Sequence, residues 1–134
     1  MATNLPYSQA CENNKAPILE KLSETFNAAG KVLEVGTGTG QHAVHFATTM
    51  PHLQWQPTDH PDAVDSCRAR LEQAALPNIL PVIELDVGAA PWPVATFTWA
   101  FSANTAHIMA WTEVEQMFRG IGERLPEGGA FCLY

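Results

Sequence analysis

Basic residues are scarce in this sequence: 7 Lys and Arg stand against 14 Asp and Glu, which gives a formal charge of −7. Proteins that bind DNA or RNA draw most of their affinity from clustered Lys and Arg on the phosphates. Binding to anionic membrane surfaces depends on the same residue types. The charge balance therefore argues against a nucleic-acid partner and against a membrane partner.

Long apolar runs and paired cysteines are missing as well. No stretch is long enough to span a bilayer, and Met1–Gln9 lacks the basic-then-apolar pattern of a signal peptide, so we expect a cytoplasmic protein. The three cysteines form no CxxC pair, which excludes a zinc knuckle and a thioredoxin-type motif. His42 and His45 lie three residues apart on a predicted helix, but no further ligand is clearly placed beside them, so we expect no metal site.

The sequence does contain an alternation of apolar strands and amphipathic helices. Its 134 residues, 46% of them hydrophobic, suffice for one compact domain over 14–134, preceded by an irregular N-terminal arm over 1–13. The alternation predicts a doubly wound α/β fold, with one parallel sheet and helices on both faces. We predict strands at 31–35, 53–57, 79–85, 97–102 and 130–134, and helices that begin at Asn14, near Gln41, after a cap at Asp62, and at a Thr112–Glu115 capping box.

A glycine-rich segment, Gly36–Gly40, separates the first predicted strand from the helix that begins near Gln41; we call it the glycine loop. Glycines let the backbone turn tightly and approach a ligand closely. The free N–H groups at the helix start point to the same place. A GxGxxG dinucleotide fingerprint would need glycine at position 41, and a Walker A loop would need a Gly-Lys-Ser/Thr ending. Both phosphate-binding interpretations are therefore weakened.

Carboxylates follow the next two predicted strands. Asp59 lies about 20 residues after Gly40, a distance at which a carboxylate accepts hydrogen bonds from ribose hydroxyls. Asp86 follows the third strand, where it can accept from an adenine amine while Val87 packs against the ring. Either carboxylate alone is explained equally well as an ordinary loop or cap residue. Their joint placement at consecutive strand ends favours a nucleoside site.

The segment from Val32 to Gly40 resembles the first motif of class I S-adenosylmethionine-dependent methyltransferases, an acidic residue, one spacer and GxGxG. The resemblance covers nearly the whole chain. It implies S-adenosylmethionine as the cofactor and a Rossmann-like sheet of order 3-2-1-4-5. It also implies a set of cofactor-binding positions in the glycine loop and at the strand ends: Glu34, Gly36, Thr37, Gly38, Gly40, Gln41, Asp59, Asp86, Val87 and Ser102.

A narrower resemblance extends to a small methyltransferase-like family of unknown substrate. It is carried by short motifs spread along the chain: Pro6-Tyr7-Ser8, Glu12-Asn13-Asn14-Lys15 with Pro17-Ile18-Leu19, Gly40-Gln41-His42-Ala43, Trp55-Gln56-Pro57-Thr58-Asp59, Leu85-Asp86-Val87, Pro91-Trp92-Pro93 and Phe101-Ser102-Ala103-Asn104. The likeness implies that Asn13, Asn14 and Lys15 fold over the cofactor as a lid. Capping of the first helix explains the same residues equally well.

The segment after the fourth strand lies where such enzymes face their methyl acceptor. Asn104 is a candidate for orienting the acceptor. His107 is a candidate for removing its proton, since histidine is the side chain that most often acts as a general base. A histidine that merely packs or caps the loop is the alternative for His107. The segment lacks the Asn/Asp-Pro-Pro-aromatic signature of amino-group DNA and RNA methyltransferases.

Class I methyltransferases continue past the fifth strand with a helix and an antiparallel hairpin, whereas this sequence ends inside that strand. We therefore expect a chain that lacks the last two strands and pairs or swaps with a second copy through the open strand edge. The leading interpretation is a methyltransferase, or a cofactor-binding part of one, for a small-molecule or protein acceptor. A non-catalytic nucleoside-binding or interaction module is the second, and a dinucleotide-dependent oxidoreductase the third.

Overall fold

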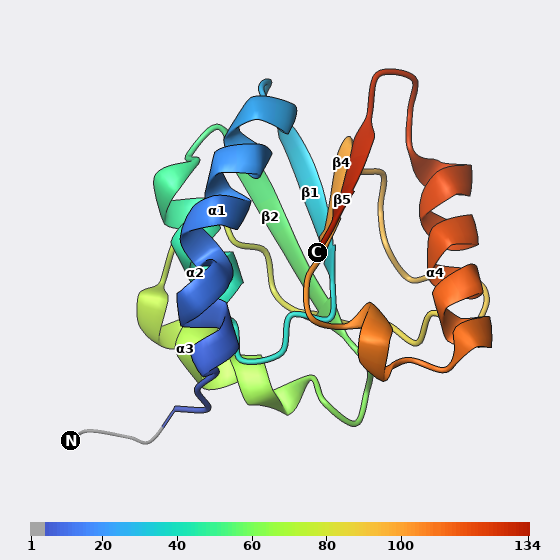
Figure 1. Ribbon diagram of the computed structural model, residues 1–134, viewed down its shortest axis with the longest axis horizontal. Coiled ribbons are helices and arrows are strands. Elements are labelled where there is room, and N and C mark those ends of the chain that lie inside the picture. Colours follow the sequence, from blue (N-terminus) through green and yellow to red (C-terminus); the bar gives the residue numbers. More distant parts are fainter. Residues whose placement is uncertain (1–4) are drawn as a thin grey trace.

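The computed structural model describes residues 5–134, which form one sheet with helices on both faces (Figure 1). Residues 1–4 of the predicted arm lie outside the described part. The elements, in chain order, are α1 (Gln9–Thr25), β1 (Gly30–Val35), α2 (Gln41–Thr49), β2 (Leu53–Asp59), α3 (Asp65–Ala74), β3 (Ile83–Glu84), β4 (Trp99–Ser102), the 3₁₀ turn η1 (Ala106–Ile108), α4 (Trp111–Arg124) and β5 (Ala130–Leu133).

The five strands run parallel in the order β3-β2-β1-β4-β5, which confirms the predicted doubly wound sheet. From β1 the chain moves outward through β2 to β3, then crosses to the other side of β1 to form β4 and β5. The direction of winding therefore reverses between β1 and β4. Ligands of open α/β sheets bind beyond the carboxyl ends of the strands at such a reversal. The loops that follow β1 and β4 are thus the place to look for a site.

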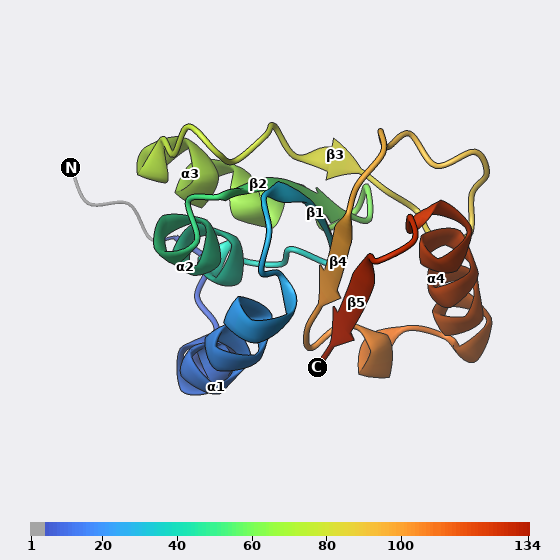
Figure 2. The same cartoon turned by 90° about the horizontal axis from the view of Figure 1, so that it is seen from above.

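Two apolar cores lie on the two faces of the sheet. Helices α1, α2 and α3 cover one face and α4 covers the other (Figures 1 and 2). In β1, Val32 packs into the first core and Leu33 into the second, as the period-two alternation of strand side chains requires. The first core is aromatic: Phe46, Trp55 and Phe101 contact one another, and Phe26 stacks on Trp99.

The first helix begins at Gln9, five residues before its predicted start at Asn14. Ser8 is the cap, since its Oγ accepts a hydrogen bond from the Cys11 backbone N–H at 3.3 Å. Pro17 consequently lies inside the helix and not in its first turn. The first turns carry few apolar residues, so apolar periodicity located only the later part of the helix. Residues 9–13 of the predicted arm are therefore helical.

The third predicted strand is much shorter than expected. Only Ile83 and Glu84 form β3, and Ile79 makes an isolated bridge to Trp55. Between them lies Pro81, which has no N–H to donate to a strand ladder. Pro81 therefore interrupts the predicted strand, which lies at the edge of the sheet.

Two helix starts also differ from the prediction. Helix α3 begins at Asp65, and Asp62 does not cap it, because the preceding turn bonds to His60 instead. Helix α4 begins at Trp111, and its Glu113 accepts from the Ala110 N–H at 2.9 Å. The predicted Thr112–Glu115 capping box is therefore wrong by two residues.

None of the helices in the described part of the chain combines the length and apolar character that a membrane crossing requires.

Candidate functional site

A cavity of about 200 Å³ opens at the carboxyl ends of β1, β2 and β3. Three of the residues predicted to bind a cofactor line it, namely Gly36, Asp59 and Val87. Apolar side chains, including Leu85 and Met109, form much of the remaining wall. A cleft with apolar walls and a few polar groups at its rim is the usual form of a small-molecule site.

Asp59 ties the end of β2 to the glycine loop. Its Oδ2 accepts a hydrogen bond from the Gly38 backbone N–H at 2.8 Å, and its Oδ1 accepts from the His60 backbone N–H at 2.9 Å. An ionised carboxylate offers about four acceptor positions. Within residues 5–134, two positions on Asp59 therefore stay available to a ligand, and the two backbone bonds hold the carboxylate in place.

The glycines of the loop differ in their surroundings. Gly36, Gly38 and Gly40 all have positive φ angles, a conformation that side chains rarely adopt. A Cβ on Gly36 would lie 2.3 Å from Thr105 Oγ1, whereas a Cβ on Gly38 would meet no atom within 4 Å. Close packing thus explains Gly36, and the space beside Gly38 is open for a ligand to approach the backbone.

Glu34 lies beneath the glycine loop and is fully buried. Its Oε1 accepts hydrogen bonds from Thr37 Oγ1 and from Trp55 Nε1, each at 3.0 Å. Burial disfavours the ionised form and raises the pKa of this carboxyl to about 7, although the two hydrogen bonds act in the opposite direction. Glu34 is thus placed to hold the loop from below and does not line the cavity.

The side chains of Asp86 and Ser102 form hydrogen bonds to backbone groups at two other strand ends. Asp86 Oδ1 accepts from the Gly88 N–H at 2.9 Å, and its Oδ2 lies 4.0 Å from His60 Nε2. Ser102 is fully buried at the end of β4, where its Oγ donates to the Val35 carbonyl at 2.7 Å. The Ser102 side chain therefore fixes the spacing of β1 and β4 at the reversal point.

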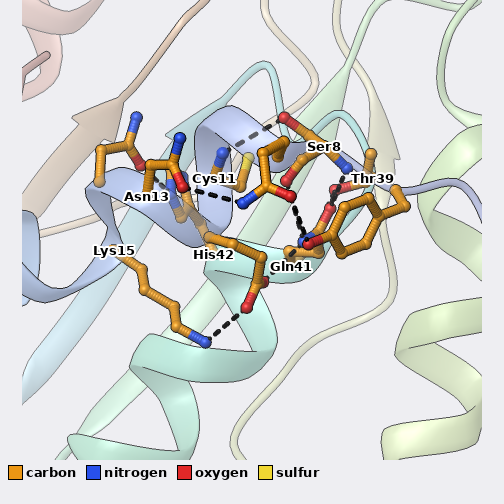
Figure 3. Close-up of polar contacts among 11 residues, drawn as sticks. Ser8, Cys11, Asn13, Lys15, Thr39, Gln41 and His42 are labelled. Atoms are coloured by element: carbon orange, nitrogen blue, oxygen red, sulfur yellow. Dashed lines mark hydrogen bonds and ion pairs between the residues drawn. The ribbon is translucent and has the colours of Figure 1, made fainter.

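A second polar cluster joins the start of α1 to the glycine loop (Figure 3). Gln41 Oε1 accepts from the Ser8 N–H at 2.6 Å and from Thr39 Oγ1 at 2.8 Å, while its Nε2 donates to Glu12 Oε2 at 2.7 Å. Glu12 also pairs with Lys15 at 2.8 Å. The side-chain amide of Gln41 is therefore engaged by the protein itself, and it seats the first turns of α1 on the loop.

Asn14 and Asn104 meet at the inner end of this cluster. Asn14 is buried, with its Oδ1 2.8 Å from His42 Nε2 and its Nδ2 3.5 Å from Asn104 Oδ1. Burial lowers the pKa of His42. Asn104 has a positive φ of 58° and a buried Nδ2 for which no partner is found among the described residues. Strained backbone and an unpartnered buried donor are features that concentrate at functional sites.

His107 lies apart from both groups. It sits on η1 with an exposed side chain and is not among the residues that line the cavity. Within residues 5–134, no three His, Cys, Asp or Glu side chains gather in a way that could hold a metal ion.

Sequence reasoning missed several residues of the cavity wall, among them His60, Thr105, Met109 and Glu113. His60 follows Asp59 directly and shares its position at a strand end, so that signal was available. Met109 and Glu113 come from the η1–α4 region, which folds back over the sheet. Nothing in their local pattern indicates this approach.

Several solved structures with a similar fold are described as methyltransferases. The apo form of the S-adenosylmethionine-dependent methyltransferase SibL is similar at a TM-score of 0.79 and 20% identity, over 92% of this chain and 36% of that one. An O-methyltransferase family protein from Burkholderia thailandensis gives 0.76 and 19%, over 92% and 38%. PKMT2 from Rickettsia typhi, solved in complex with AdoHcy, gives 0.66 and 18%, over 85% and 23%.

These likenesses confirm the Rossmann-like class I methyltransferase fold that the sequence predicts. The chain spans less than two fifths of the length of each of these three proteins. The model of the family described as "Protein of unknown function (DUF938)" matches residues 5–134, so the chain belongs to that family.

Proposed function

We propose that this member of the DUF938 family binds S-adenosylmethionine at the carboxyl ends of β1, β2 and β3 and takes part in methyl transfer to a small-molecule or protein acceptor. The observation that carries the proposal is the cavity into which Gly36, Asp59 and Val87 converge. Its residues fit the cofactor. An apolar wall suits a purine ring, a carboxylate suits a ribose, and the glycine backbone beside it is open.

Asp59 is the proposed ribose acceptor. Its two backbone hydrogen bonds leave one free position on each carboxylate oxygen. Two ribose hydroxyls are vicinal donors that match two such positions. Asp86 and Val87 are the proposed adenine contacts, with Asp86 accepting from the exocyclic amine and Val87 packing against the ring. Val87 is buried in the apolar wall, as this role requires.

The glycine loop is the proposed binding site for the methionine portion of S-adenosylmethionine. Gly38 presents its backbone to open space, and Glu34 holds Thr37 from beneath, so the loop is supported without protein atoms on its outer side at Gly38. Asn14, from the start of α1, completes the proposed cofactor set. Its position on α1, seated by Gln41, supports the lid that the narrower family resemblance implies.

The bound sulfonium would supply an electrophilic methyl group, so the protein's work is mainly to position the acceptor and to exclude water. We propose that Asn104 orients the acceptor, a role that its unpartnered buried Nδ2 supports. His107 is the proposed proton acceptor for substrates that must lose a proton. Its exposed place on η1 leaves it free to meet one.

Calorimetric titration with S-adenosylhomocysteine tests the cofactor site. We expect saturable binding by the wild type and a loss of roughly 10- to 100-fold in affinity for Asp59→Ala, because hydrogen bonds to a charged group contribute about 1.5–3 kcal/mol. Asp65→Ala is the matched control, since this carboxylate is exposed on α3 and pairs with Arg68. Thermal melts show whether Asp59→Ala still folds after losing its bond to Gly38.

Absence of saturable binding by the folded wild type would overturn the cofactor proposal. Binding without methyl turnover by the full-length gene product would favour the second interpretation, a nucleoside-binding or interaction module with this fold. Turnover that is lost on Asn104→Ala, with S-adenosylhomocysteine affinity retained, would support the assignment of Asn104 to the acceptor side.

A further inference from the structure

His60 links the two carboxylates assigned to the nucleoside, and it has no role in the sequence prediction. Its backbone N–H donates to Asp59 Oδ1 at 2.9 Å, and its ring Nε2 lies 4.0 Å from Asp86 Oδ2. The same residue lines the cavity that Asp59 enters. One residue thus contacts the proposed ribose acceptor through its backbone and faces the proposed adenine acceptor with its ring.

The contacts of the His60 imidazole indicate which of its two nitrogens carries the hydrogen. The Asp62 backbone N–H donates to His60 Nδ1 at 3.1 Å, whereas the Asp62 carboxylate lies farther away, with its Oδ2 3.6 Å from the same nitrogen, so Nδ1 is an acceptor in this arrangement. A neutral imidazole that accepts at Nδ1 carries its hydrogen on Nε2. The hydrogen-bearing nitrogen is therefore the one that lies 4.0 Å from Asp86 Oδ2, a distance at which it attracts the carboxylate without a direct hydrogen bond. Asp86 Oδ1 already accepts from the Gly88 N–H, so both oxygens of this carboxylate face a donor.

We infer that His60 is a positioning residue that orients Asp86 to accept a hydrogen bond from a 6-amino purine, so that the site selects adenine over 6-oxo purines. This inference rests on the proposed function. A 6-oxo purine such as hypoxanthine places a carbonyl acceptor where adenine has a donor, and an oriented carboxylate repels it. A carboxylate free to rotate would discriminate less, because it could turn away from the carbonyl.

The test compares binding of S-adenosylhomocysteine with that of S-inosylhomocysteine, which has a 6-oxo group and an N1–H in place of the 6-amino group and unprotonated N1 of adenine. Two variants separate the functions of the ring. His60→Asn keeps an acceptor near the Nδ1 position for the Asp62 N–H but has no donor that reaches Asp86. His60→Gln places a side-chain amide near the Nε2 position and so keeps that donor. A role confined to the turn before α3 would change stability in these variants and leave the ratio of the two affinities unchanged.

We expect the wild type to bind S-adenosylhomocysteine at least about tenfold more tightly than S-inosylhomocysteine, since one unfavourable polar contact costs about 1–3 kcal/mol. His60→Asn is expected to reduce this ratio severalfold, and His60→Gln to retain most of it. In an Asp86→Asn background, His60→Asn should change the ratio no further, because the two residues act through one contact.

An unchanged ratio in folded His60→Asn, or an equal loss in the Asp86→Asn background, would overturn the inference and leave the proposed function intact. A folded wild type that binds neither ligand would overturn the proposed function itself, and the role of His60 with it.

Discussion

The buried carboxyl of Glu34 leads to a quantitative prediction about pH. In the folded chain, burial raises its pKa from 4.5 to about 7. Between these values the unfolded chain has lost the proton while the folded chain keeps it, so the folded state binds more protons. The contribution of Glu34 to stability then falls as pH rises through this window and levels off above about 7. The full difference corresponds to about 3 kcal/mol.

Glu34→Gln removes this titration and keeps most of the geometry. The glutamine has the same shape, and its carbonyl oxygen can accept the hydrogen bonds from Thr37 and Trp55. It stays neutral at every pH in both states. We therefore expect the unfolding free energy of the variant, minus that of the wild type, to rise by about 3 kcal/mol between pH 4.5 and pH 8.

Urea unfolding followed by tryptophan fluorescence measures this difference at a series of pH values. Trp55 contacts Glu34 directly and provides a local reporter. Glu20→Gln, which removes an exposed carboxylate from α1, is the control and should follow the wild type at a constant offset. Parallel curves for the wild type and Glu34→Gln over the whole range would refute the reasoning, since no proton would then be held by Glu34 in the folded state alone.

Two further predictions concern the glycine loop and the seat of α1. Gly36→Ala and Gly38→Ala both place a side chain at positive φ, at a cost of about 1–2 kcal/mol, but only Gly36→Ala clashes with Thr105, so urea unfolding should show it to be less stable by a further 1–3 kcal/mol or so. Equal losses of unfolding free energy in the two variants would exclude the clash. S-adenosylhomocysteine titration should show weakened binding for Gly38→Ala, although this variant is the more stable of the two. Gln41→Ala should speed hydrogen exchange of amides in the first turns of α1, and unchanged exchange would mean that Gln41 does not seat this helix.

Prediction from sequence succeeded where a local pattern reports directly on the fold. Apolar strands alternate with amphipathic helices, and parallel strands joined by helices permit few topologies, so the sheet followed from local signals. The glycine loop and Asp59 were found because strand ends on a parallel sheet share one edge. The cavity brings Gly36, Asp59 and Val87 together there, although their role in binding stays a prediction.

Prediction failed where hydrogen bonding, and not the apolar period, decides the local structure. The start of α1 depends on the Ser8 cap and on the hydrogen bond from the Ser8 N–H to Gln41, which lies 33 residues away in the chain. Strand β3 is short because Pro81 has no backbone N–H to donate to the strand ladder. Each of these results from hydrogen-bonding needs that the apolar period does not report.

The sequence by itself determined the order of the elements, the two cores and the residue types at the strand ends, because these depend on the hydrophobic period and on backbone chemistry within a few residues. Only the tertiary structure decided that His60 lies between Asp59 and Asp86, that Glu34 is buried against Trp55, and that Asn14 meets Asn104. Those relations join separate elements of the fold. Their distances are set by how helices and strands pack, which no single segment of the chain specifies.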